Sequence, residues 1–170
     1  RRLAAPGDQP PPSAAGDRRR MNWQTVFALT NGWALIGWIA LAILPRRPLV
    51  LSAILYLGVA LLCLAYAAML AGLLSGMLDG GGPALMAADL ARFDVTLLQR
   101  LFQAPGGVVL GWTHFLAFDL FIGLWIARDA DAKQIGRLWQ LPILFVTLMA
   151  GPIGLLFWLI VREPRARAIR

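Results

Sequence analysis

Gly111-Trp-Thr-His-Phe-Leu-Ala-Phe-Asp-Leu-Phe-Ile-Gly-Leu-Trp-Ile-Ala-Arg-Asp-Ala130 is long enough and apolar enough to cross a lipid bilayer as a single helix. The stretch nevertheless contains His114 and, near its middle, Asp119. A carboxylate at the centre of a spanning helix costs about 2.5–3.5 kcal/mol on insertion scales, so such residues usually face a bundle interior or a water-filled cavity. The stretch therefore predicts a membrane-spanning helix that carries a functional polar group.

The composition of the whole chain is also typical of a membrane protein. Of the 170 residues, 59% are hydrophobic and only 15% are charged, well outside the range of soluble domains. The net charge of +7 does not indicate nucleic-acid binding, because the Lys and Arg residues cluster in the tails and short connections beside apolar runs. Membrane lipids, and no nucleic acid, are the expected partners.

Four apolar runs are each long enough to cross a hydrocarbon core of roughly 30 Å. Lipid cannot satisfy an open backbone, so each run is predicted to be a helix. The predicted fold is all-α, an integral membrane protein with four transmembrane helices. The predicted spans are residues 23–44, 49–72 (or as far as 78), 108–127 and 138–161. Small residues and Gly151-Pro152 in the fourth span predict close helix packing and a kink.

The one long connection joins the second and third spans. Apolar residues recur at helical spacing from Leu90 to Phe102, with polar residues opposite, which predicts an interfacial amphipathic helix. Asp94 projects from the apolar side, either because the helix is locally rotated or shortened or because Asp94 points into the bundle mouth. An even number of spans places both tails and this connection on one side, which the positive-inside rule assigns to the cytoplasm.

The chain is predicted to be one domain flanked by two tails. Residues 1–21 form a basic tail with almost nothing to bury, and are expected to be disordered. Residues 22–162 form the four-helix transmembrane domain, and residues 163–170 form a basic C-terminal tail.

Asp119 is the first candidate catalytic residue. A desolvated carboxylic acid that stays protonated can act as a general acid near neutral pH. The structural alternative is a buried acid that joins helices through a hydrogen bond, for which Asn31 of the first span is the natural partner. His114 lies five residues earlier, about 140° round an ideal helix, so the two side chains do not share a face. His114 instead shares a stripe with Phe118 and Trp125, which suits packing as well as ligand binding.

No metal or cofactor site is predicted. His114 is the only histidine, and the lone Cys63 has no metal-ligand spacing around it. Asp129 and Asp131 form an Asp-x-Asp pair of a kind that holds Mg²⁺ on phosphorylated substrates, which alone is weak evidence. No nucleotide-binding or hydrolase motif is present. The residues alone leave open an enzyme acting on a lipophilic substrate and a non-catalytic binding or assembly subunit.

The stretch 111–130 closely resembles the hallmark of one membrane-protein family. This is the family of the plant abscisic-acid-deficient neoxanthin-formation factor, which has bacterial and algal relatives. The segment Leu148–Phe157 followed by Arg162, and Thr30–Trp33 followed by Trp38, resemble further parts of the family pattern. The resemblance covers about residues 22–162.

The resemblance implies a four-helix membrane protein of carotenoid metabolism. In plants the family is required to convert violaxanthin into neoxanthin, in which an epoxide opens to give an allenic alcohol. This acid–base isomerisation needs no redox cofactor, and none is expected. The implied function is a carotenoid isomerase acting on a carotenoid or related isoprenoid. A non-catalytic carotenoid- or lipid-binding or assembly subunit is the alternative.

The predicted site combines the family-motif positions with the aromatic stripe. Its catalytic residues are Asp119 and His114, and its substrate-binding residues are Asn31, Phe118, Trp125, Arg128 and Asp129. The expected ligand is a carotenoid or isoprenoid, and assembly into a homo-oligomer or with other membrane proteins is left open. The Ala- and Arg-rich tail favours a bacterial inner membrane, with the chloroplast envelope of a plant or alga as the alternative.

Overall fold

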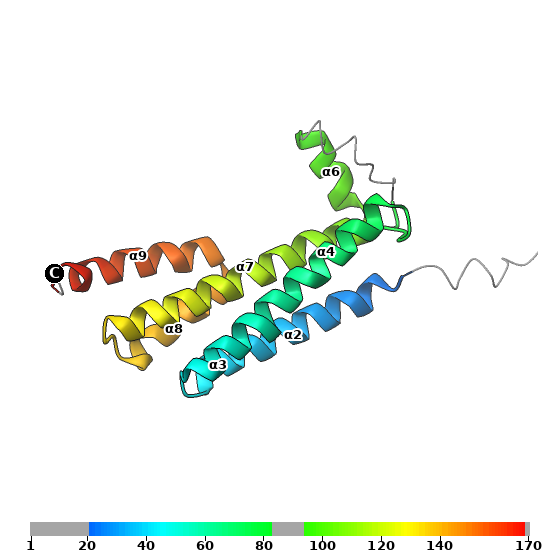
Figure 1. The fold of residues 1–170 in the computed structure, drawn as a ribbon. Coiled ribbons are helices and arrows are strands. Elements are labelled where there is room, and N and C mark those ends of the chain that lie inside the picture. The colour runs from blue at the N-terminus through cyan, green and yellow to red at the C-terminus, as the bar shows by residue number, and fades with distance from the viewer. Residues whose placement is uncertain (1–20, 83–93, 169–170) are drawn as a thin grey trace, which may run out of the picture.

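The computed structural model describes residues 21–82 and 94–168, and all the regular structure in these ranges is helical (Figure 1). The predicted N-terminal tail therefore lies outside the described residues, except for Met21. The elements in chain order are α2 (Trp23–Ile43), α3 (Pro48–Ala53), the π-helix η1 (Ile54–Ala60), α4 (Leu61–Leu74), α6 (Val95–Gln103), α7 (Pro105–Ala132), α8 (Arg137–Met149) and α9 (Gly151–Ala168).

Three helices among the described residues are long and apolar enough to cross a bilayer. They are α2, the continuous helix Pro48–Leu74 formed by α3, η1 and α4, and α7, with 21, 27 and 28 residues. They match the first three predicted spans to within a few residues. Pro105 begins α7, three residues before the predicted start of the span, because the first position of a helix does not use a backbone N–H.

The predicted fourth span, residues 138–161, is two helices rather than one. α8 ends at Met149, Ala150 leaves the helical region (φ −153°, ψ 69°), and α9 begins at Gly151. Pro152 has no N–H with which to continue the α8 hydrogen-bond ladder. A break therefore replaces the expected kink, and a count of four continuous spans is not confirmed. α9 extends to Ala168, into the predicted C-terminal tail.

α8 and α9 form a hairpin that reaches only part of the way along α7 (Figure 1). Near the end of α7, Asp129 bonds to Trp158 and Arg162 of α9. The turn at Gly151 lies instead against Asp119, ten residues earlier on α7. At about 1.5 Å per residue, this separation is roughly 15 Å, or half of a hydrocarbon core about 30 Å thick. The hairpin thus has the dimensions of a re-entrant segment.

The two ends of the bundle carry different parts of the chain (Figure 1). The Asp79 end holds the start of α2, the turn after α4, and α6, where the Trp23 indole N–H donates to the Asp79 carbonyl at 2.9 Å. The Arg46 end holds the α2–α3 and α7–α8 turns and the C-terminal part of α9. In the described residues α2 begins at the Asp79 end and α9 ends at the Arg46 end, because the hairpin returns to the end at which it started. This arrangement differs from the predicted placement of both tails on one side of the membrane.

The charge of the described residues differs between the two ends. Arg100 is the only described Lys or Arg at the Asp79 end. The Arg46 end carries six with described side chains, and the positive-inside rule favours a cytoplasmic location for it. These six are Arg46, Arg47, Arg128, Lys133, Arg137 and Arg162.

The half-spanning hairpin makes a topology prediction. Single cysteines at Asn22 and Gly81 should react with a membrane-impermeant thiol reagent from one side of the membrane. Cysteines at Lys133 and Glu163 should react from the other, in a background in which the exposed Cys63 is replaced by serine. Reaction of positions 22 and 163 from the same side would indicate a fourth complete crossing and contradict this arrangement.

α7 is the central helix, and small residues bring its neighbours close. Gly37 of α2 and Gly58 of η1 both face Leu120, and a Cβ at Gly58 would lie 3.2 Å from Leu120 Cδ2. Gly123 of α7 similarly faces the ring of Trp38. Helices in lipid associate through such close packing, because burial from water supplies no driving force there.

α6 supplies an amphipathic helix in the long connection, as predicted, beginning at Val95. Asp94 is its N-cap, and the Asp94 carboxylate accepts a hydrogen bond from the Leu97 N–H at 2.7 Å. Asp94 therefore departs from the apolar pattern because it precedes this helix, and it does not point into the bundle mouth. The predicted helical residues 90–93 lie outside the described residues.

Candidate functional site

Asp119 lies in the middle of α7 and points at the turn between α8 and α9. Its carboxylate is so close to Gly151 that any Cβ at that position would overlap it. Asp119 therefore faces the N-terminus of α9, where the helix dipole favours a carboxylate. Its side chain makes no hydrogen bond or ion pair with any other described residue.

Asn31 does not bond to Asp119, so the predicted hydrogen bond between them is wrong. Its Nδ2 donates to the Phe27 carbonyl at 2.7 Å, and its Oδ1 accepts from Trp112 Nε1 at 3.0 Å. Trp112 precedes Asp119 by seven residues, which is almost two full turns or about 10 Å of helix. Asn31 thus lies on the same face of α7 as Asp119, but nearer the Asp79 end.

The hairpin leaves this face of α7 uncovered between Asp119 and the Asp79 end. Trp112 is 44% exposed there and Phe115 57%, and Asp119 is itself partly exposed. Both aromatic residues lie within about 40° of Asp119 round the helix. A lipophilic molecule in the bilayer can therefore approach Asp119 sideways, beneath the hairpin turn.

His114 lies on another face of α7, as its spacing from Asp119 predicted. Its ring packs on Phe118 with centroids 4.5 Å apart, and on Tyr66 of α4 at 5.6 Å. His114, Phe118 and Trp125 are all exposed, so the predicted aromatic stripe lies at the membrane-facing surface. The two predicted catalytic residues do not meet.

Asp129 is the centre of an ion-pair group at the Arg46 end. Its Oδ1 lies 2.6 Å from Lys133 Nζ, and its Oδ2 lies 2.8 Å from Arg162 Nε. Trp158 Nε1 donates to Oδ2 at 3.1 Å, and the Arg162 guanidinium also lies over the Trp125 ring, 5.3 Å from its centroid. Asp129 and Trp125 thus hold α9 against α7, a role that the sequence did not indicate.

Arg128 and the Asp-x-Asp pair complete the predicted residues of this region. Arg128 is exposed and makes no hydrogen bond or ion pair within the described part of the chain. The Asp129 carboxylate pairs with Lys133 and Arg162, whereas the Asp131 carboxylate pairs with Arg46. The described residues contain no group of three or more His, Cys, Asp or Glu side chains that could hold a metal ion.

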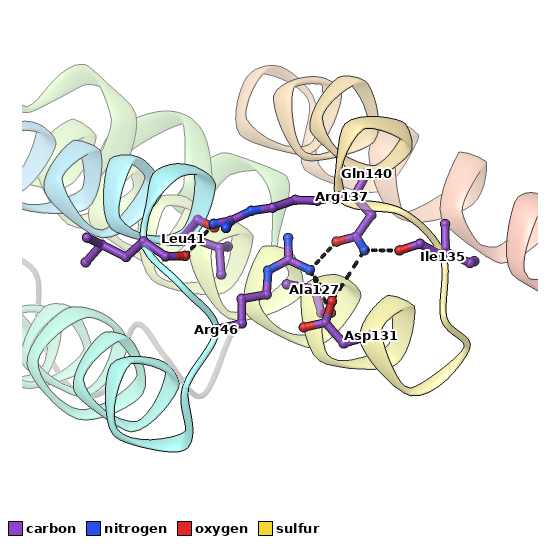
Figure 2. Close-up of polar contacts among 8 residues, drawn as sticks. Leu41, Arg46, Ala127, Asp131, Ile135, Arg137 and Gln140 are labelled. Carbon is purple, nitrogen blue, oxygen red and sulfur yellow. Dashed lines mark hydrogen bonds and ion pairs between the residues drawn. The ribbon is translucent and has the colours of Figure 1, made fainter.

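A second polar network, not predicted from the sequence, centres on Arg46 (Figure 2). The Arg46 side chain follows α2, is only 7% exposed and reaches both α7 and α8. Its Nη1 donates to Asp131 Oδ1 at 2.7 Å, to the Ala127 carbonyl at 3.1 Å and to Gln140 Oε1. The fully buried Gln140 in turn donates to the Ile135 carbonyl at 2.6 Å.

Arg137 makes the reciprocal connection from α8 to α2 (Figure 2). Its Nη2 donates to the carbonyls of Leu41 and Leu44, at the end of α2 where carbonyls have no intrahelical partner. Burial lowers the pKa of Arg46, the Asp131 carboxylate opposes this effect and the nearby Arg137 charge adds to it. A guanidinium stays charged despite such a shift. The two arginines therefore clamp the base of the hairpin to α2 and α7.

Comparison with protein families identifies the family of this chain. The family model described as ABA4-like, or ABA DEFICIENT 4-like, matches residues 25–158, which is most of the chain and extends from the first turn of α2 into α9. This match confirms the resemblance inferred from the residues. No curated protein and no solved structure gives a significant match.

Proposed function

Because the chain belongs to the ABA DEFICIENT 4-like family, we propose that it is an integral membrane protein acting on a carotenoid or a related long isoprenoid. The proposed reaction is an acid–base isomerisation, as in the conversion of an epoxide to an allene by the plant relatives. The observation that carries the proposal is the Asp119 carboxyl, which faces the α8–α9 turn at a surface open to the bilayer. A bacterial inner membrane is the proposed location.

The proposed chemistry needs one proton donated and one removed. An acid protonates the epoxide oxygen as a C–O bond breaks, and a base takes a proton from the polyene so that its electron pair forms the new C=C bond. Protonated Asp119 would supply the first proton. The resulting carboxylate, stabilised by the N-terminus of α9, would accept the second. Asp119 is thereby regenerated, and neither His114 nor an oxidant is required.

The uncovered face beside Asp119 is the proposed binding surface for the polyene. Trp112 and Phe115 offer aromatic surface to the ligand, and Asn31 holds the Trp112 indole in place. The stripe of His114, Phe118 and Trp125 is a second exposed aromatic surface on α7, and stays a candidate for contact with the ligand outside the catalytic position.

A non-catalytic carotenoid- or lipid-binding subunit is the second candidate function. The observation that favours it is the lack of a second acid or base next to Asp119 among the described residues. The enzyme requires a bound carotenoid and its conversion, whereas the subunit requires a bound carotenoid or lipid without conversion.

The binding surface also makes a testable prediction. Protein purified in mild detergent from a carotenoid-producing host should retain a long polyene detectable by extraction and mass spectrometry. Replacing both Trp112 and Phe115 with alanine should remove most of it, because the ligand loses its aromatic contacts. Phe145→Ala on α8, equally exposed to lipid, is the matched control and should retain the pigment. Recovery of phospholipids alone from the parent protein would contradict the carotenoid isomerase and leave a lipid-binding subunit as the candidate function.

A further inference from the structure

A separate apolar groove lies between α2 and the α3–η1 helix. It has a volume of about 390 Å³ and extends from Trp33 and Leu57 at one end to Leu44 and Leu49 at the other. Its lining comes almost entirely from apolar side chains and small residues of these two helices. The distance from Trp33 to Leu44 is eleven residues of helix, or about 16 Å. The groove therefore has the length of one hydrocarbon chain in one leaflet.

The groove is closed toward the centre of the bundle. Gly37 and Gly58, which both line it, touch the side chain of Leu120, and Leu120 is fully buried. Asp119 is the preceding residue of α7 and projects about 100° away round the helix. The groove does not lead to Asp119, so it is distinct from the proposed isomerisation site.

The end of the groove near the middle of α2 is fixed by a hydrogen bond between its two walls. Trp33 Nε1 donates to the Leu57 carbonyl at 2.6 Å. Leu57 lies within the π-helix η1, where the backbone ladder departs from the regular α pattern, as is frequent at functional sites. The opposite end opens at the turn between α2 and α3.

A free positive charge stands at this open end. Arg47 lies in the turn between the rim residues Leu44 and Leu49, is exposed, and makes no side-chain hydrogen bond or ion pair with any described residue. The neighbouring Arg46 is buried and faces α7 and α8 instead. The guanidinium group suits the bidentate recognition of phosphate, and the excess of Lys and Arg at the Arg46 end attracts anionic lipid.

We propose that this groove is a binding site for an anionic phospholipid. One acyl chain lies between α2 and η1, and the phosphate pairs with Arg47. A carotenoid has no anionic group and gains nothing from Arg47, so the charge at the mouth selects the phospholipid. The bound lipid fills the space between the first two spanning helices at the end where Arg46 and Arg137 hold the hairpin.

Native mass spectrometry of delipidated protein with added phosphatidylglycerol tests the proposal. The parent should hold one tightly bound lipid. Ala53→Phe, which fills the groove from an exposed position, and Arg47→Gln should each weaken its binding by roughly tenfold or more. Ala40→Leu fills the groove from α2 and should act like Ala53→Phe. Arg128→Gln removes an exposed charge at the same end, away from the groove, and should leave binding unchanged.

Three outcomes would overturn the proposal. One is unchanged phosphatidylglycerol binding in both groove-filling variants. Another is an equal loss in Arg128→Gln and Arg47→Gln, which would indicate a diffuse charge effect. The third is a bound carotenoid that Ala53→Phe removes and Arg47→Gln leaves in place, which would make the pigment the occupant. None of these results depends on conversion at Asp119.

Discussion

Replacing Asp119 with asparagine is expected to lower carotenoid conversion by a factor of roughly 10² or more, the scale of general acid–base catalysis. Asparagine has nearly the same shape and fits against Gly151, but it has no proton to transfer at neutral pH. The variant should therefore insert and fold like the parent. Pigment analysis in a carotenoid-producing host measures conversion, and a thermal melt of the detergent-purified protein checks the fold.

His114→Gln is the matched control for this prediction. His114 lies in the same helix but on another face, packed on Phe118 and Tyr66, so its replacement should leave conversion close to that of the parent. Conversion by Asp119→Asn at the level of the parent would remove Asp119 from the mechanism. An equal loss in both variants would return His114 to the catalytic site.

Removing the Asp129 carboxylate should produce the largest loss of stability. Asp129 is only 14% exposed and compensates the charges of Lys133 and Arg162. Asp129→Ala leaves these two cations close together without a counterion, and the loss of one partner from a buried ion pair costs about 3–5 kcal/mol. Because the same carboxylate anchors α9, the hairpin turn should also move away from Asp119. A thermal melt in detergent measures the first effect, and thiol reactivity of an Ala150→Cys variant measures the second.

Arg128→Ala provides the comparison for Asp129→Ala. Arg128 is the preceding residue and is exposed, so its loss should change the stability by no more than about 0.5 kcal/mol. Equal melting temperatures for the two variants would mean that the Asp129 ion pairs contribute nothing net to the attachment of α9.

Three of the helices could be predicted well because apolar runs of spanning length end at prolines and glycines, which interrupt helices. Pro45 and Pro48 separate α2 from α3, and Gly80–Gly82 follow the second span. Hydropathy failed at Ala150, where one residue leaves the helical backbone conformation and the chain turns back on itself. The composition on either side of Ala150 is that of a continuous span, so hydropathy alone cannot distinguish a crossing from a hairpin.

The position of Asp119 near the middle of a spanning-length helix was readable from the sequence, but its surroundings were not. Asn31 was the natural partner by residue type, yet the heights and rotations of α2 and α7 pair it with Trp112. Gly151 was predicted to be a packing residue, and it does allow close approach, but to a carboxylate. Contacts between spans depend on relative height and rotation, which periodicity within one span does not determine.

The Arg46 network escaped prediction for a different reason. Basic residues in a short turn after a span are usually topology signals, and Pro45-Arg-Arg-Pro48 has that form. Only the fold shows that the first of these arginines is buried against Asp131 and Gln140 while the second stays outside. Long side chains in turns reach residues far away in sequence, and no local pattern records this.

The hairpin also sets the order in which the chain can be assembled during synthesis. The segment from Leu138 to Met149 leaves the ribosome before Arg162, so α8 is made before the residue that attaches α9 to Asp129 exists. The three long helices can already be in the bilayer at that stage. Docking of α9 through Arg162 therefore follows the synthesis of α8, and a nascent chain that stopped short of Arg162 would lack the ion pair that fixes the hairpin turn beside Asp119.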